Sequence, residues 1–236
     1  MSVILKTIKG IDSYDLSKSE KFLDHHNTSH SKTEAILNQF ENEFYSFLDD
    51  NEDLVMIDLG ANIGLFSLYM SSICKEIYSV EPTPSHIEIM KDLLDKLQVK
   101  NIFPNQVAIH TKNGEEEFQL NSSNSTMNSF LRHGIDPGGT DSVTVPTTTL
   151  ADFIKNTVKK RVNFVKMDIE GFENIIVHDP SFEEAIKEID AIYVEVHDFG
   201  GAGKMEENVN RVVERLESLG KKTMKLTYDG VLGYDG

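Results

Sequence analysis

The chain has 236 residues, of which 39% are hydrophobic and 26% charged, so it is long and apolar enough to bury one sizeable core. Its 39 acidic residues outnumber the 23 Lys and Arg residues, which gives a formal net charge of −16. A polyanion requires a basic surface on its protein partner, so this charge argues against DNA or RNA as a ligand. A single cysteine, Cys74, excludes an intrachain disulfide and a cysteine-based zinc site, and it fits a reducing compartment.

Nothing in the sequence predicts insertion into a membrane or secretion. No stretch reaches the roughly 18 to 20 consecutive apolar residues of a membrane-spanning helix. The apolar run Val3–Leu5 near the N-terminus is too short for the core of a signal peptide. We therefore expect a cytoplasmic protein without a membrane span.

The first part of the chain reads as an extension ahead of the main domain. Residues 1–30 are polar and weakly patterned, whereas apolar residues recur at spacings of three and four over residues 33–48, which predicts a helix. We divide the chain into an N-terminal extension at residues 1–50, partly helical and a candidate cover for a substrate, and a main domain at residues 51–236.

Strands and helices alternate along the main domain. Apolar runs predict strands at residues 54–59, 76–81, 101–110, 162–169, 190–197 and 221–228, and two shorter extra strands at 114–121 and 141–149. Helices are predicted at residues 63–73, 84–97, 149–157, 172–177, 182–189 and 205–220. Strands joined through helices predict an α/β fold with a doubly wound, mostly parallel sheet. The polar stretch 121–141 is long enough to form a lid.

Several charged side chains stand where the predicted strands end. In a doubly wound sheet, ligands bind at the carboxyl ends of the strands, near the point where the strand order reverses. Side chains at these ends should therefore converge on one edge of the sheet. They are Asp58, Glu81, Asp168, Glu195 and His197.

The first predicted strand ends in the stretch IDLGANIGLF, which places a carboxylate and two glycines before a helix. Glycines permit a tight turn and a close approach of the backbone to a ligand. A dinucleotide-binding fingerprint needs glycines at positions 60, 62 and 65, but this chain has Asn62 and Leu65. Asp58 also disfavours a pyrophosphate and favours a cationic or hydroxyl-bearing ligand. The alternative is a purely structural glycine turn.

The second predicted strand ends in a carboxylate that suits a ribose. Glu81 lies 23 residues after Asp58, in the stretch VEPTP. A carboxylate at this position can accept hydrogen bonds from both ribose hydroxyls. Enzymes that bind NAD use the same arrangement, so Glu81 indicates an adenosine ribose rather than one particular cofactor.

Four stretches together resemble the motifs of the FkbM family of S-adenosylmethionine (SAM)-dependent methyltransferases, over about residues 54–226. They are IDLGANIGLF, VEPTP, FVKMDIEGFE and IYVEVH. The resemblance implies the seven-stranded, Rossmann-like sheet of class I methyltransferases. It also implies O-methylation of a hydroxyl on a small molecule or a carbohydrate.

The resemblance further implies a SAM site. The turn formed by Gly60, Ala61, Asn62 and Gly64 would wrap the methionine part of the cofactor, and Glu81 would bind its ribose. Gln106 and Val107 would lie beside the adenine. Asp58 would face the ammonium group of the cofactor or the water around it.

The stretch VKMDIEGFE places several charged residues at the end of a predicted strand. Alternation along a strand places Lys166 and Asp168 on one face and Met167 on the other, and Gly171 turns the chain into the next helix. By resemblance this is the catalytic edge of the sheet. The alternative, for Lys166 and Glu173, is a structural ion-paired strand end.

The stretch YVEVHDF closes the next strand with Glu195 and His197 on one face. Together with Asp168 they suit a divalent metal such as Mg²⁺. His197 also suits a general base that removes the proton of the acceptor hydroxyl. A histidine that merely pairs with a neighbouring carboxylate is the third explanation.

Two other functions compete with a methyltransferase. A nicotinamide-dependent oxidoreductase would use the same type of sheet, although the missing glycines at positions 62 and 65 disfavour it. A SAM-binding protein without turnover is the second rival. The C-terminus departs from the class I pattern, because only VLGYDG remains after MKLTYDG to form the last strand of the usual antiparallel pair.

Overall fold

The computed structural model describes residues 4–6, 13–28, 53–120, 128–130, 141–198, 204–226 and 229–235. The chain divides into two compact units, Met1–Asn105 and Gln106–Gly236. The predicted helix at 33–48 and most of the predicted loop at 121–141 lie outside the described residues.

Three parallel strands form the sheet portion of the first unit. They are β3 (Leu54–Leu59), β4 (Cys74–Val80) and β5 (Ile102–Asn105), joined by α3 (Leu65–Met70) and α4 (Pro84–Leu97). All six residues of β3 are buried, as expected for a strand of a parallel sheet covered on both faces. Pro84 lies in the first turn of α4, where its missing N–H group costs no hydrogen bond.

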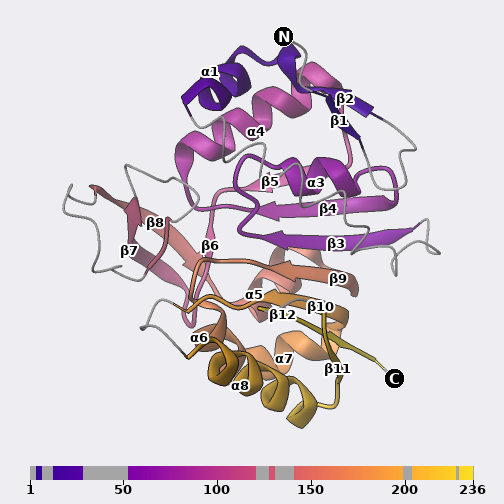
Figure 1. Cartoon of the computed structure of the whole chain (residues 1–236), viewed down its shortest axis with the longest axis vertical. Helices are drawn as coiled ribbons and strands as arrows, with labels where there is room; N and C mark the ends of the chain where they lie inside the picture. The colour runs from indigo at the N-terminus through magenta and orange to yellow at the C-terminus, as the bar shows by residue number, and fades with distance from the viewer. Residues whose placement is uncertain are drawn as a thin grey trace. The chain divides into compact units, whose positions relative to one another are not determined.

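The N-terminal segment is more regular than its sequence indicates. A hairpin of β1 (Ile4–Lys6) and β2 (Ser13–Asp15) is followed by a 3-10 turn (Leu16–Lys18) and by α1 (Glu20–Thr28), which packs on α4 (Figure 1). Leu16 and Phe22 are fully buried. These few anchors are too widely spaced to give a periodic pattern, which is why the sequence suggested only a weakly patterned extension.

The second unit carries the other strands of the main sheet. They are β9 (Val162–Met167), β10 (Ile189–Glu195), β11 (Lys222–Lys225) and β12 (Gly230–Tyr234). β9 and β10 are parallel, whereas β12 pairs antiparallel with both β10 and β11. The final antiparallel pair of a class I sheet is therefore present, and the short stretch VLGYDG is sufficient to form it.

Helices and a small sheet complete the second unit. The helices are α5 (Leu150–Phe153), a π-helix (Ile154–Val158), α6 (Glu173–His178), α7 (Phe182–Ala185) and α8 (Met205–Ser218). The small sheet has the order β6-β8-β7, from Ala108–Ile109, Asp141–Thr148 and Gly114–Leu120. The helices within the described ranges include none that is long and apolar enough to cross a membrane.

The main sheet has seven strands in the order β11-β12-β10-β9-β3-β4-β5. This order runs outward from β3 through β4 to β5 in one direction and from β9 to β10 in the other, which is doubly wound topology. The predicted α/β fold with a mostly parallel seven-stranded sheet is confirmed.

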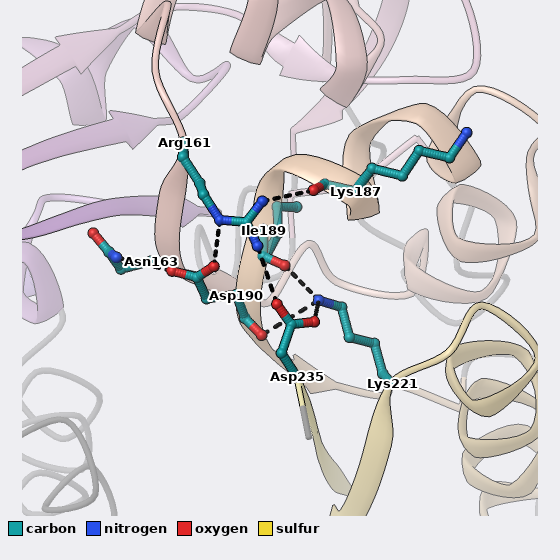
Figure 2. A network of polar contacts seen from close by, with 7 residues as sticks. All are labelled: Arg161, Asn163, Lys187, Ile189, Asp190, Lys221 and Asp235. Atoms are coloured by element: carbon teal, nitrogen blue, oxygen red, sulfur yellow. Dashed lines mark hydrogen bonds and ion pairs between the residues drawn. The ribbon is translucent and has the colours of Figure 1, made fainter.

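A network of polar contacts ties the C-terminal strands to the start of β10 (Figure 2). Lys221 is 6% exposed, and its Nζ donates to the main-chain oxygens of Ile189 and Asp190 and to Oδ1 of Asp235. Arg161 donates from Nε to Asp190 Oδ1 (2.6 Å) and from Nη2 to Asp235 Oδ2 (3.0 Å). Because Nζ of the buried Lys221 donates both to the start of β10 and to Asp235, which directly follows β12, it holds the end of β12 against β10.

Candidate active site

The chain makes a tight turn directly after β3, which we call the glycine turn (residues 60–64). Gly60, Asn62 and Gly64 all adopt positive φ angles, of 79°, 51° and 85°. The N–H groups of Gly60 and Ala61 both donate to the main-chain oxygen of Val80, at 3.0 Å each. The turn is therefore fastened to the end of β4, the strand that leads to Glu81.

Gly64 is required by packing as well as by backbone conformation. A Cβ atom on this residue would lie 2.7 Å from Cγ of Met90 in α4. No real side chain tolerates that distance, so a larger residue would push α4 away from the turn. Gly64 therefore has a structural role in the glycine turn, and its role in binding a cofactor stays a prediction.

Glu81 is buried and held by donors on three residues. Its Oε2 accepts from the N–H of Asn62 (3.0 Å), and its Oε1 accepts from the N–H of Thr83 (2.9 Å) and from Nδ1 of His86 (3.3 Å). Burial by itself raises the pKa of this carboxyl, but the hydrogen bonds and charge of His86 and the hydrogen bonds of Thr83 outweigh it and lower the pKa. Glu81 is thus an ionised, fixed acceptor, and Oε2 retains a lone pair for a ligand hydroxyl.

Asp58 lies deeper than expected for a residue that contacts a ligand. It is 0% exposed, and its Oδ2 accepts from Oγ of Ser67 in α3 at 2.6 Å. Oγ of Ser67 also lies 2.7 Å from Oγ of Ser79 in β4. The structure therefore gives Asp58 a role in fixing α3 to the strands. Its contact with a cofactor stays a prediction. The contact of Gln106 and Val107, which follow β5, with an adenine also stays a prediction.

In the second unit, charged residues gather at the ends of β9 and β10. We call them the strand-end cluster: Lys166, Asp168, Glu170, Glu173, Glu195 and His197. Nζ of Lys166 donates to Oδ2 of Asp168 at 2.8 Å, as the predicted shared face requires. The chain then turns through Glu170 (φ 54°) and Gly171 (φ 96°). Glu173 Oε1 holds this turn by accepting from the N–H groups of Ile169 and Gly171.

His197 is oriented by Glu173. Its Nδ1 lies 3.0 Å from Oε1 of Glu173, a carboxylate that is 1% exposed. Because a carboxylate oxygen accepts, we assign the hydrogen to Nδ1. The other ring nitrogen, Nε2, lies 3.7 Å from Oδ1 of Asp168 and 3.8 Å from Oε2 of Glu170. A buried carboxylate that orients an imidazole in this way is common in catalytic and metal sites.

The charges of the cluster shift the pKa values of its members strongly. Burial would lower the pKa of His197, but Glu173, Asp168 and Glu170 raise it to about 10. Burial and the charge of Asp168 raise the pKa of Glu170 to about 8. The charge of Asp168 and burial raise the pKa of Glu195 to about 7. At neutral pH His197 is therefore an imidazolium, which argues against the general base role that the sequence suggested for it.

Asp168 is the ionised centre of this group. Burial raises its pKa, but the charges of Lys166 and His197 and the hydrogen bond from Lys166 outweigh that and lower it. Two members, Glu170 and Glu173, were absent from the predicted catalytic set. Alternation along a strand identifies Lys166 and Asp168, but it does not extend into a turn with positive φ angles. The signal that could have found them is the EGFE stretch itself, with carboxylates on both sides of a glycine.

Three residues of the cluster have the geometry of a metal site. Ligand atoms of Asp168, Glu170 and His197 all lie within 4.8 Å of one another. The sequence suggested Asp168, Glu195 and His197. The structure keeps two of these and places Glu170 in the third position, because the turn after β9 brings Glu170 back toward His197.

The raised pKa values predict that the protein loses stability as the pH rises. His197 binds its proton more tightly when folded, so its stabilisation is complete below its unfolded pKa of about 6.5 and is lost as the pH rises toward 10. In EDTA, we expect the free energy of unfolding to fall on the order of 2–3 kcal/mol between pH 6.5 and 10. His197→Asn should flatten this dependence in urea titrations; an equally steep profile in the variant would contradict the assignment.

The comparisons with known proteins identify the family. The model of the Methyltransferase FkbM domain matches residues 58–223, which is well over half of the chain. The match contains the glycine turn, Glu81 and the whole strand-end cluster. The fold is thus that of a Rossmann-like methyltransferase domain. The chain belongs to the FkbM methyltransferase family.

Three solved structures with partial similarity to the chain are reported by their identity, coverage and TM-score. Methyltransferase FkbM from Methylobacillus flagellatus KT is 14% identical with a TM-score of 0.47, over 78% of this chain and 44% of that one. Precorrin-6y C5,15-methyltransferase from Geobacter metallireducens is 14% identical with a TM-score of 0.48, over 84% of this chain and 88% of that one. Fibrillarin, a pre-rRNA processing protein from Methanococcus jannaschii, is 16% identical with a TM-score of 0.46, over 78% of this chain and 67% of that one. None of the curated proteins matches the chain.

Proposed function

We propose that the chain is a SAM-dependent O-methyltransferase that acts on a hydroxyl of a small molecule or a carbohydrate. The observation that carries this proposal is Glu81, a buried and ionised carboxylate that is hydrogen-bonded to the glycine turn. This arrangement offers a fixed acceptor to a ribose beside a turn that lets a ligand approach the backbone. Membership of the FkbM family supports the choice of SAM over NAD.

The cofactor supplies a methyl group on a positively charged sulfur, so the protein needs to add little chemistry of its own. It must hold the acceptor oxygen in line with the methyl group and take up the proton of the hydroxyl. The acceptor oxygen then gains the methyl group as it loses its proton, and the sulfur keeps the electron pair of the broken bond. No group has to be oxidised or reduced.

We assign the proton uptake to a carboxylate of the strand-end cluster. Glu170 and Glu195 have pKa values of about 8 and about 7, near the pH at which a general base works best. The His197 imidazolium stands beside Glu170 and lowers its pKa, while Lys166 keeps Asp168 ionised. The cluster thus contains carboxylates whose pKa values lie near neutral pH, together with the cations of His197 and Lys166.

A divalent metal is the second candidate for activating the acceptor, favoured by the spacing of Asp168, Glu170 and His197. A set of one imidazole and two carboxylates suits Mn²⁺ better than Mg²⁺, which prefers oxygen ligands. We expect calorimetry to show at least tenfold tighter binding of Mn²⁺ than of Mg²⁺, and His197→Asn to remove the preference. If neither ion binds at millimolar concentration, the metal is excluded and the carboxylate base is left as the group that activates the acceptor hydroxyl.

The other candidate functions have less support. An oxidoreductase that binds NAD would need the glycines missing at positions 62 and 65. A SAM-binding scaffold would not require the tuned pKa values of the strand-end cluster. The net charge of −16 disfavours a nucleic-acid acceptor. Cys74, the single cysteine, is buried, in keeping with the proposed cytoplasmic location.

Labelled SAM tests the proposed reaction. The protein should transfer the label to oxygen in a panel of sugars and small alcohols, with the product identified by mass spectrometry. Asp168→Asn should abolish transfer and leave SAM binding intact. Tight SAM binding without any O-methylated product, or a product methylated on nitrogen, would contradict the proposal.

A further inference from the structure

The N-terminal segment packs on the helix that follows Glu81. The contacts described here lie within the first unit. Oγ of Ser19 donates to Oδ2 of Asp92 in α4 at 2.6 Å, and Nζ of Lys21 lies 3.4 Å from Oε2 of Glu88. Figure 1 shows α1 beside α4. This segment precedes residue 58, where the family match begins, so the family does not account for it.

His86 connects this packing to Glu81. It lies in the first turn of α4, is 3% exposed, and has its Nδ1 3.3 Å from Oε1 of Glu81. The ring of His25 in α1 meets the ring of His86 nearly at right angles, with centroids 6.1 Å apart and an interplanar angle of 81°. A line of contacts therefore runs from α1 through His86 to the carboxylate proposed to bind the ribose.

The hydrogen bond of His86 links Glu81 to a ring that also meets α1. Asn62 donates to Glu81 through its backbone N–H, and Thr83 donates through its backbone N–H and its side chain. His86 donates through a side chain, and it fixes Oε1 so that Oε2 faces the N–H of Asn62. Without this donor the glutamate side chain regains rotamer freedom, which binding must then remove.

We propose that His86 is a positioning residue for the ribose-binding carboxylate, and that His25 in α1 holds its ring, which makes His25 part of the cofactor site. This inference rests on the proposed function, because it assumes that Glu81 binds the ribose of SAM. It assigns His25 of the N-terminal segment to the cofactor site, whereas the sequence suggested a cover for the substrate.

Two substitutions separate the hydrogen bond from the packing. In His86→Asn the amide nitrogen takes the place of Nδ1 and keeps the donor, whereas His86→Leu keeps the volume and removes it. By calorimetry with S-adenosylhomocysteine (SAH), we expect His86→Leu to bind about tenfold more weakly than the wild type, and His86→Asn to bind within about threefold of it. If His86→Leu does not fold, His86→Gln replaces it, because its amide reaches the position of Nε2 instead.

A ligand without ribose hydroxyls separates a positioning role of His86 from a merely structural one. Loss of a positioning role weakens the binding of SAH only, whereas structural damage weakens the binding of both ligands. The wild type and the two variants should all bind 2′,3′-dideoxy-SAH with the same, weaker affinity. An equal loss of affinity for both ligands in His86→Leu would overturn the inference, because the damage would then be general. So would unchanged SAH binding in that variant.

The role of α1 is tested separately with a matched control. His25→Ala should weaken SAH binding about threefold, whereas Lys21→Ala, which removes another contact between α1 and α4, should not. Equal effects of the two substitutions would overturn the role of α1. If the wild type does not bind SAH at all, the proposed function itself fails. If the wild type binds and His86→Leu binds equally well, only the present inference fails.

Discussion

Replacing Glu81 with Gln is expected to weaken SAM and SAH binding by about 10- to 100-fold. The substitution removes a charged acceptor whose hydrogen bond to a ligand hydroxyl contributes about 1.5–3 kcal/mol. It also introduces an amide N–H₂ group near the donors of Asn62 and Thr83. Calorimetric titration of the wild type and the variant measures the effect directly.

Glu88→Gln is the matched control for this prediction. Glu88 lies in the same unit, and its side chain is 69% exposed in an ion pair with Lys21, so the substitution removes one negative charge without touching the turn. It should leave both dissociation constants unchanged. If Glu81→Gln binds SAH as tightly as Glu88→Gln does, Glu81 does not bind the ribose.

Replacing His197 with Asn is expected to reduce turnover by about 10²- to 10⁴-fold without changing SAH affinity. Asn keeps a donor near the position of Nδ1, so the hydrogen bond to Glu173 is retained, but nothing replaces Nε2. Loss of the imidazolium raises the pKa of Glu170 further, because His197 now lowers it. The remaining activity should therefore have its optimum at a higher pH.

His178→Asn controls for the loss of a histidine from the same unit. His178 is exposed, and its Nδ1 lies 2.8 Å from the main-chain oxygen of Asn174, away from the strand-end cluster. Steady-state rates of methyl transfer across pH 6 to 10 compare the two variants. Wild-type turnover in His197→Asn, or an equal loss in His178→Asn, would remove the cluster from the mechanism.

The main sheet could be predicted because its strands are continuous apolar runs separated by helices. LVMIDL is buried at every position, and such runs are typical of parallel strands. The alternation of Lys166 and Asp168 likewise placed both on one face, where they pair. Local patterns were sufficient for the regular strands of the main sheet.

Contacts between distant segments could not be predicted in the same way. The N-terminal hairpin and α1 are held by isolated residues such as Leu16 and Phe22, which form no periodic pattern. The approach of Glu170 to His197 depends on two positive φ angles in a turn. The pKa of His197 depends on three carboxylates from the segment that follows β9. Because the sequence does not show that these carboxylates surround the ring, it could not predict that His197 is protonated at neutral pH.

The most direct test of the account is calorimetric titration of the wild type with SAM, SAH and, as a control, NADH. We predict micromolar binding of SAM and SAH and no binding of NADH, because the glycine turn and Glu81 form a site for adenosine without the glycines that a dinucleotide needs. Binding of NADH, with no heat from either methyl-cofactor species, would contradict the account and favour an oxidoreductase.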